Sequence, residues 1–593
     1  MNAAFRFAGL SLLTVILLAT GGRAIAAEER TEAEKATITR GFELARKFCG
    51  RCHGEGSSQG NAQFSIIDPE GMIKSREKYV VPGNADESYT WQRIEAGDMP
   101  PPDVEAALRP SAEEKGVLKA WIALGAAKPP RPPRPFRSEK ETLTALLDDL
   151  RRAKPANRPF LRYFSLTHLH NNSERVSEFD LRYYRAALAK ALNSLTWEST
   201  LVQPRAVDAE RTLFAIDLRT LGWDSRDWDA LLEHYPYGLR YDRSPDDSVA
   251  QLAGEVRQLC GSPIPHLRGD WFAVAATRPP LYHRLLDLPL TDRELEQQLG
   301  VNVEQNIADN VARRAGFAES GVSVSNRLVE RHPARLGYYW KSYDFKRSNG
   351  TGSLFQFPLG PLTKGHPFPD FAFVHDGGEI IFSLPNGLQG YYLSDGKGKR
   401  IDSGPIEVVR DLKETSGTPL VVNGVSCMHC HQNGMIDFRD SVRDGLAVFG
   451  EIRRKTLDLY PPVDEMQKLV DRDRKQFRAA LDEVLSPWMT DGKAVAGAAP
   501  ESLGEPIAIA TRFYGADVDL QTAAFELGLA DTAELAGAIK NNPRLRRLGL
   551  GPLLNRQKID RQMWESIEAI TSPMQQVARE MDLATPYTQL PAP

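Results

Sequence analysis

Cys49-Gly-Arg-Cys52-His53 and Cys427-Met-His-Cys430-His431 are two Cys-x-x-Cys-His pentads, and they contain four of the five cysteines of this chain of 593 residues. Such a pentad attaches haem covalently: its thiols form thioethers with the porphyrin vinyl groups, and the adjacent histidine binds the iron. We therefore expect two covalently bound c-type haems, attached through Cys49, Cys52, Cys427 and Cys430, with His53 and His431 as axial iron ligands. Two zinc or redox Cys-x-x-Cys sites are the alternative.

The residues around the first pentad predict a small helical domain. A helical pattern runs from Lys35 to Phe48 into the pentad, and a second runs from Ser111 to Leu124, beginning with a capping box. Between them, Met99 is followed by three prolines, which make the segment extended and stiff. We expect Met99 to be the sixth ligand of the first iron; a buried methionine without iron is the alternative.

This arrangement resembles a class I cytochrome c domain, from about residue 30 to about 127. Val81-Pro82-Gly83, followed by the Met-Pro-Pro segment, is similar to the version attached to large planctomycete-type exported proteins. The resemblance implies a low-spin electron carrier with His/Met ligation. The residues to which it carries over are Cys49, Cys52, His53 and Met99.

The beginning of the chain is typical of an export signal. Arg6 precedes an apolar run from Leu10 to Leu18, and small residues follow up to Ala27. We expect residues 1–27 to be a cleaved signal peptide, with an uncleaved anchor as the alternative, and no membrane span after cleavage. Export to the periplasm agrees with covalent haem attachment. Cys260 is left over and is expected to be a small buried core residue.

The rest of the chain is expected to be a larger, mainly α unit. Residues 28–127 form the predicted cytochrome c domain, 128–140 a basic, proline-rich linker and 141–593 the large domain, with a C-terminal helical subdomain at about 500–593. The linker could also be a docking ligand. Short segments separated by Asp-Gly, Asn-Gly and similar turns predict a small antiparallel β-meander at about 371–410. The second haem, at 427–431, should pack against that sheet.

The sixth ligand of the second haem is not evident from the sequence. Met435 and His429 are too close to His431 in the chain to reach the opposite face of the ring. The candidates are His375, at the tip of the first hairpin, His168, His170, Met466, Met489 and an open position. His375 is the named candidate.

Two classes of function follow from these features. A formal net charge of −4 with mixed signs gives no electrostatic case for binding nucleic acid. The first hypothesis is a periplasmic dihaem cytochrome that transfers electrons to or from an unidentified redox partner protein. The second is a haem enzyme, peroxidase-like or acting on another small-molecule substrate, with an open position at the second iron; a haem-based redox sensor is a further option.

Overall fold

The computed structural model describes residues 30–53, 65–66, 69–102, 109–129, 133–242, 244–412, 414–489, 505–567 and 570–589. The predicted signal peptide at 1–27 and residues 130–132 of the predicted linker lie outside these ranges. The fold is mainly α, as the sequence predicts. Within the described ranges, no helix combines the length and the apolar character that crossing a bilayer requires.

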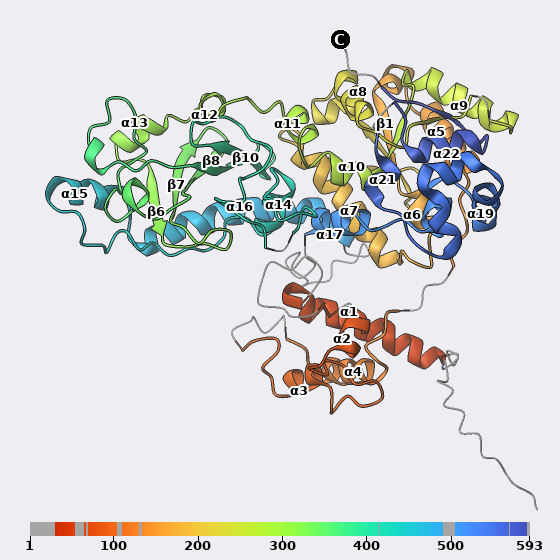
Figure 1. Cartoon of the computed structure of the whole chain (residues 1–593), viewed down its shortest axis with the longest axis horizontal. Helices are drawn as coiled ribbons and strands as arrows, with labels where there is room; N and C mark the ends of the chain where they lie inside the picture. The colour runs from red at the N-terminus through yellow and green to blue at the C-terminus, as the bar shows by residue number, and fades with distance from the viewer. Residues whose placement is uncertain are drawn as a thin grey trace, which may run out of the picture.

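The described part of the N-terminal unit contains the helices α1 (Glu32–His53), α2 (Pro69–Lys74), α3 (Tyr89–Glu95) and α4 (Ala112–Ala123). Helices α1 and α4 cross at Gly41, where an added Cβ would lie 2.2 Å from Cβ of Trp121. The predicted capping box is present, because Ser111 and Glu114 bond each other's backbone amides at the start of α4. Buried side chains between Ile38 and Ala126 form a core of their own, and the unit lies below the rest of the molecule (Figure 1).

The remaining chain forms two lobes that lie side by side (Figure 1). One lobe contains a four-stranded sheet in the order β2-β3-β1-β5. Its strands are β1 (Leu161–Ser165), β2 (Arg205–Ala206), β3 (Leu213–Asp217) and β5 (His266–Arg268). Its helices up to residue 285 are α5 (Glu139–Arg152), α6 (Thr167–Asn171), α7 (Glu178–Ser194), α8 (Ser225–Glu233), α9 (Asp247–Cys260), α10 (Gly269–Ala275) and α11 (Leu281–Leu285). Cys260 is fully buried, as predicted.

The C-terminal helices belong to this same lobe. They are α17 (Pro506–Tyr514), α18 (Leu520–Glu526), α19 (Thr532–Asn541), α20 (Pro543–Leu545), α21 (Arg561–Glu565) and α22 (Pro573–Glu580), and β11 (Thr585–Pro586) pairs with β4 (Leu239–Arg240). Their buried side chains share one core with α7 and α10. Lys190 of α7 forms a buried ion pair with Glu505 at 2.7 Å. The predicted C-terminal subdomain is thus packed into the lobe that begins near residue 139.

The second lobe is built on a five-stranded antiparallel sheet in the order β10-β9-β8-β7-β6. The strands are β6 (Arg313–Phe317), β7 (Arg327–Ala334), β8 (Gly337–Asp344), β9 (Gly377–Ser383) and β10 (Gln389–Asp395). The predicted meander at 371–410 is correct for β9 and β10 only, because the sheet continues into three strands upstream; residues 399–402 and 406–409 are not strands.

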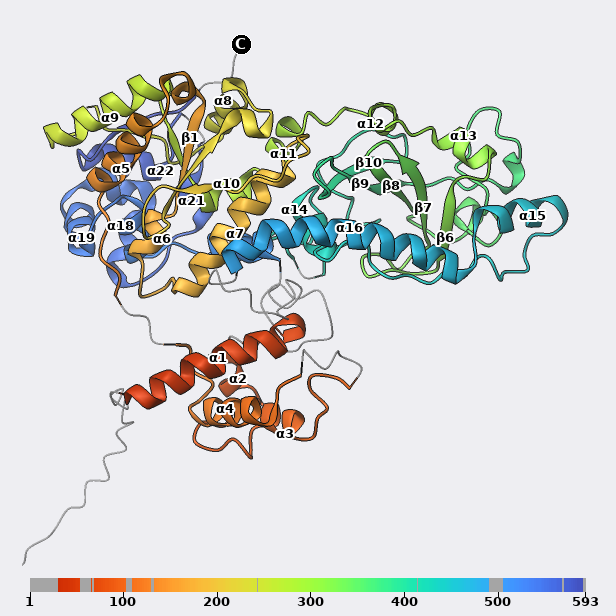
Figure 2. The same ribbon diagram turned by 180° about the vertical axis from the view of Figure 1, so that it is seen from behind.

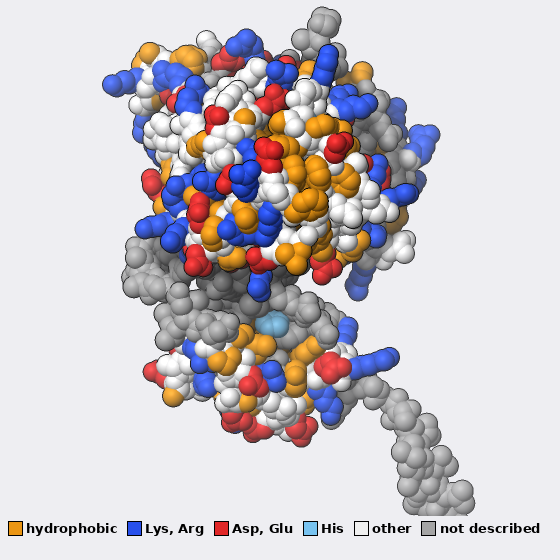
Figure 3. All heavy atoms as spheres, turned by 90° about the vertical axis from the view of Figure 1, so that its left-hand side faces the viewer, with side chains coloured by type: hydrophobic (Ala, Val, Ile, Leu, Met, Phe, Trp, Pro, Cys, Tyr) orange, Lys and Arg blue, Asp and Glu red, His pale blue; other side chains and the backbone are white. Residues whose placement is uncertain are grey.

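The helices of this lobe are α12 (Asp292–Leu299), α13 (Val303–Ala308), α14 (Val425–Cys430), α15 (Gly450–Leu459) and α16 (Val463–Met489). The long helix α16 runs along the sheet and reaches α7 at the boundary between the lobes (Figure 2). Acidic and basic side chains are interspersed on the end of the molecule that carries this lobe (Figure 3). Neither charge sign dominates the described part of this face (Figure 3).

Residues 133–137 of the predicted linker are fixed to the body of the protein. The guanidinium of Arg134 donates to the carbonyls of Leu169 (3.2 Å), His170 (2.9 Å) and Val176 (2.7 Å), at and just beyond the end of α6. The amide of Arg137 donates to Oδ1 of Asn171 at 2.9 Å. Residues 133–137 are therefore held against the large body by hydrogen bonds and do not form a free linker.

Candidate haem-binding sites

The first pentad lies at the end of α1. Cys49 and His53 are half-buried there, and the side chain of Cys52 lies outside the described residues. Burial lowers the pKa of His53. Its imidazole is therefore neutral at neutral pH and has the lone pair that an iron ligand needs.

Met99 is half-buried in an irregular segment that follows α3. Gly97, with a φ of +78°, turns the chain out of the helix, and the amide of Met99 donates to the carbonyl of Arg93 at 3.1 Å. The guanidinium of Arg109 donates to the carbonyls of Gly97 at 2.9 Å and Pro100 at 3.1 Å. Arg109 thus holds the segment on both sides of Met99. No sequence pattern marked this arginine, because its acceptors are backbone carbonyls.

The second pentad begins on the short helix α14. Gly424, with a φ of +85°, precedes the helix, and a Cβ there would lie 2.4 Å from the carbonyl oxygen of Thr277. The amide of Val422 donates to Oγ of Ser426 at 3.1 Å, which closes the turn into the helix. Cys427 is buried, and His431 is 8% exposed. The second attachment segment is therefore built into the core of its lobe.

A cavity of about 630 Å³ lies between α14 and the five-stranded sheet. This volume is in the range of sites that bind a cofactor-sized ligand. Cys427, Cys430 and His431 line it on the α14 side. Its apolar lining includes Phe317, Val329, Trp340, Ile381, Leu393, Ile401, Val408, Val421, Met435 and Phe438. An apolar cavity beside paired cysteines and a histidine suits a porphyrin.

The imidazole of His431 is oriented as an iron ligand requires. Its Nδ1 lies 3.2 Å from the carbonyl oxygen of Gly434, and since a carbonyl only accepts, Nδ1 carries the proton. This bond fixes the ring and leaves Nε2 as the atom that binds a metal. Nε2 lies 3.6 Å from a carboxylate oxygen of Glu379 on β9. The chemistry of these donors fits the haem that the pentad predicts.

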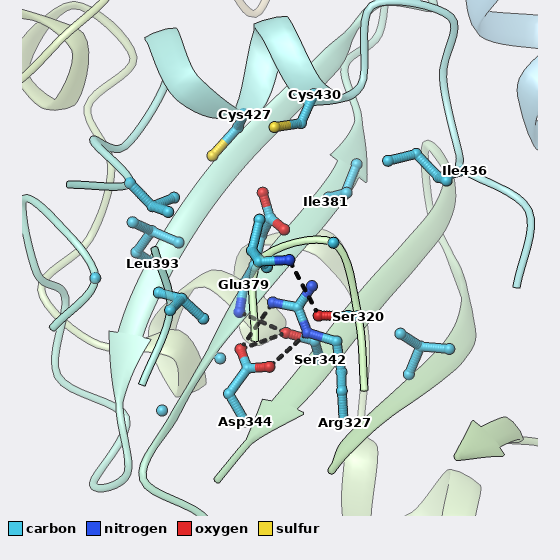
Figure 4. Close-up of a pocket in the computed structure, with 18 of the residues that line it drawn as sticks. Ser320, Arg327, Ser342, Asp344, Glu379, Ile381, Leu393, Cys427, Cys430 and Ile436 are labelled. Carbon is cyan, nitrogen blue, oxygen red and sulfur yellow. Dashed lines mark hydrogen bonds and ion pairs between the residues drawn. The ribbon is translucent and has the colours of Figure 1, made fainter. Parts of the chain in front are cut away.

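One face of the sheet forms the opposite wall of the cavity. The strand register places Arg327 of β7 across from Asp344 of β8, and Glu379 of β9 across from Leu393 of β10. Arg327 pairs with Asp344 through contacts of 2.5 and 3.0 Å, and Asp344 also accepts from Oγ of Ser342 at 3.1 Å. The side chains of Glu379 and the two cysteines point into the same space (Figure 4). Arg327, Asp344 and Glu379 are site residues that no sequence pattern predicts.

The carboxylate of Glu379 is ionised. Burial raises its pKa, but a protonated His431 and Arg327 together outweigh burial and hold the pKa at about 2. Glu379 therefore contributes a negative charge to this wall at neutral pH, 3.6 Å from Nε2 of His431.

His375 does not line this cavity. Its ring packs edge-on against Tyr343, with 5.0 Å between the ring centroids. Tyr343 donates to Glu330 and belongs to the opposite face of the sheet, since neighbouring strand residues alternate between faces. The structure therefore gives no support to His375 as the sixth ligand of the second iron.

The other proposed sixth ligands also lie elsewhere. His168 bonds to Asp270 at 2.9 Å in the other lobe, and His170 bonds to the carbonyl of Pro135 at 3.1 Å. Met466 is part of the packed core, and Met489 packs against it at the end of α16. Of the named side chains, only His429 and Met435 line the cavity, and both belong to the segment that carries His431.

Comparison with known proteins supports the interpretation of the N-terminal unit. Residues 49–103 match the model of the Planctomycete cytochrome C family. The match includes the first pentad and Met99 and ends before α4. No curated protein matches the chain, and no solved structure does. The pentad, the crossed helices and this match together identify a cytochrome c-type domain near the N-terminus of the chain.

Proposed function

We propose that this protein is a periplasmic dihaem c-type cytochrome that transfers electrons between a His53/Met99 haem and a second haem ligated by His431. The observation that carries the proposal is the cavity of about 630 Å³ beside the second pentad, with His431 oriented by Gly434. Haem bound at each pentad would supply one-electron chemistry at its iron. The protein would supply attachment, orientation and a low-polarity setting.

A contact between the N-terminal unit and the large body supports transfer within one molecule. The guanidinium of Arg46, on α1 one turn before the pentad, lies 3.5 Å from the ring centroid of Phe179 and 4.9 Å from that of Tyr183, at the start of α7. Arg46 is only 9% exposed. Helix α7 packs against α17, which packs against α14. A continuous set of packed helices thus joins the two attachment segments.

Rapid reduction kinetics test this proposal. A small reductant is mixed with wild-type protein and with a Met99→His variant, whose first haem should have a lower potential because imidazole replaces the thioether. We expect the two haems to be reduced one after the other. One kinetic phase should have a rate that does not depend on the reductant concentration, and this rate should change in the variant. Haems that are reduced independently, with no such phase in either protein, would contradict transfer between them.

A second candidate function is a haem enzyme, peroxidase-like or acting on another small molecule. The observation that favours it is the position of the sixth-ligand candidates: none of His375, His168, His170, Met466 or Met489 lines the cavity. Carbon monoxide added to the reduced protein separates the candidates. Uptake at one haem supports the enzyme or a redox sensor, and uptake at neither supports transfer alone.

A further inference from the structure

The position of Glu379 has a chemical consequence for the second site. Gly434 lies beyond the pentad, and its carbonyl accepts the Nδ1 proton of His431, so Nε2 is the ring nitrogen left to bind a metal. A carboxylate oxygen of Glu379 lies 3.6 Å from that nitrogen. A cation between Nε2 and this oxygen, whether a proton or a metal ion, is stabilised by both atoms. A metal that binds Nε2 would lie on this side of the ring.

The separation of the two atoms also suits a shared metal. Bonds from a first-row metal to imidazole nitrogen and to carboxylate oxygen are about 2.0–2.2 Å long, so ligands on opposite sides of one ion are about 4 Å apart. The observed 3.6 Å is a few tenths of an ångström shorter.

The sheet holds Glu379 in this position. Its amide donates to Oγ of Ser342 at 2.8 Å, and Ser342 in turn donates to Asp344. Asp344 is fixed by its paired contacts with Arg327. The close-up shows the Glu379 carboxylate between this group and the two cysteines (Figure 4). Glu379 is thus carried on rigid strands, which favours a defined ligand geometry.

We propose that Glu379 occupies the sixth coordination position of the second haem iron, opposite His431. This inference rests on the proposed dihaem function and names the distal residue that the sequence did not reveal. A carboxylate is a weak-field oxygen ligand, so a ferric haem held in this way would be high-spin. An external ligand would then have to displace the carboxylate to reach the iron.

Electron paramagnetic resonance of Glu379→His and Glu319→His tests the proposal. Glu319 also lines the cavity but is exposed at its rim, so it is the matched control. In wild type we expect one high-spin and one low-spin ferric haem. Glu379→His should convert the high-spin signal to low-spin, because imidazole is a stronger-field ligand, and Glu319→His should leave both signals unchanged. A Glu379→His spectrum identical to wild type would overturn the proposal.

The near-isosteric Glu379→Gln keeps the test decisive if the histidine variant does not fold. An internal ligand bound for about nine-tenths of the time weakens the apparent affinity of an external ligand about tenfold. Cyanide should therefore bind the ferric Gln variant about ten times more tightly than wild type, and unchanged affinity would refute the assignment. Haem content is measured on every sample. A wild-type protein with one haem contradicts the proposed function, whereas two haems with no response at Glu379 contradict this inference alone.

Discussion

Replacement of Asp473 by alanine should destabilise the sheet that forms the wall of the second cavity. Asp473 lies on α16 with a side chain 2% exposed. It accepts from the guanidinium of Arg331 at 2.7 and 3.1 Å, and from the indole of Trp340 at 2.9 Å. Trp340 lines the cavity. Asp473 therefore connects the helix to two adjacent strands of the wall.

The size of the effect follows from burial. Removing one partner of a buried ion pair leaves an uncompensated charge and costs about 3–5 kcal/mol. Asp471→Ala is the matched control, because Asp471 is on the same helix and 56% exposed, and loss of an exposed pair costs about 0–1 kcal/mol. The double variant Arg331→Met/Asp473→Leu should regain most of the loss, since it removes both buried charges together.

Hydrogen exchange measured by mass spectrometry is the appropriate assay, because it reports the opening free energy of β7 and β8 peptides separately from the rest of this multi-unit chain. Asp473→Ala should accelerate exchange in these peptides far more than Asp471→Ala. Equal exchange in the two variants would refute the reasoning, as would a double variant that is less stable than Asp473→Ala.

Three further predictions concern other parts of the molecule. Arg109→Ala should weaken the absorption band of the Met99–iron bond in the first haem, since Arg109 donates to the carbonyls of Gly97 and Pro100 on either side of Met99. An unchanged band would show that Arg109 is not needed to position Met99. Arg46→Ala should expose the linker to limited proteolysis by loosening α1 from α7, whereas Arg40→Ala, at a side chain 58% exposed, should not. Burial raises the pKa of Glu526, but Arg268 and Arg561 outweigh it and hold the pKa at about 2, below its ordinary 4.5. The charged carboxylate thus stabilises the fold above pH 4.5, and this stabilisation is lost as pH falls from 4.5 towards 2. Thermal unfolding at several pH values should show that drop in wild type and a smaller drop in Glu526→Gln.

The helices were the most predictable part of this fold. The apolar periodicity and the Ser111 capping box predicted α4, and the helical pattern from Lys35 to Phe48 lies within α1. The sheet was predicted only at β9 and β10, where turn residues separate short strands. Strands β6 and β7 contain charged residues that form buried ion pairs, namely Arg314 with Glu330 and Arg331 with Asp473. Because of these residues, the sequences of the two strands do not resemble apolar strands.

The haem-binding residues also include some that the sequence predicts and some that it does not. The cysteines and His431 stand together in the sequence, because thioether attachment needs both thiols next to the ligand histidine. The facing wall comes from strands that lie about 50 to 100 residues earlier, and strand register alone brings Arg327, Asp344 and Glu379 to one face. No local pattern in the sequence encodes that pairing. A hairpin-tip position favours His375 as a ligand, but its ring packs against Tyr343, on the face of the sheet away from the cavity.

The central claim is that both pentads hold haem covalently. Its most direct test is the intact mass of the mature protein, measured for wild type, for Cys49→Ser/Cys52→Ser and for Cys427→Ser/Cys430→Ser. We expect wild type to carry the added mass of two haems and each double variant to carry one. A wild-type protein with the mass of a single haem, or a Cys427→Ser/Cys430→Ser variant that retains both, would contradict the account.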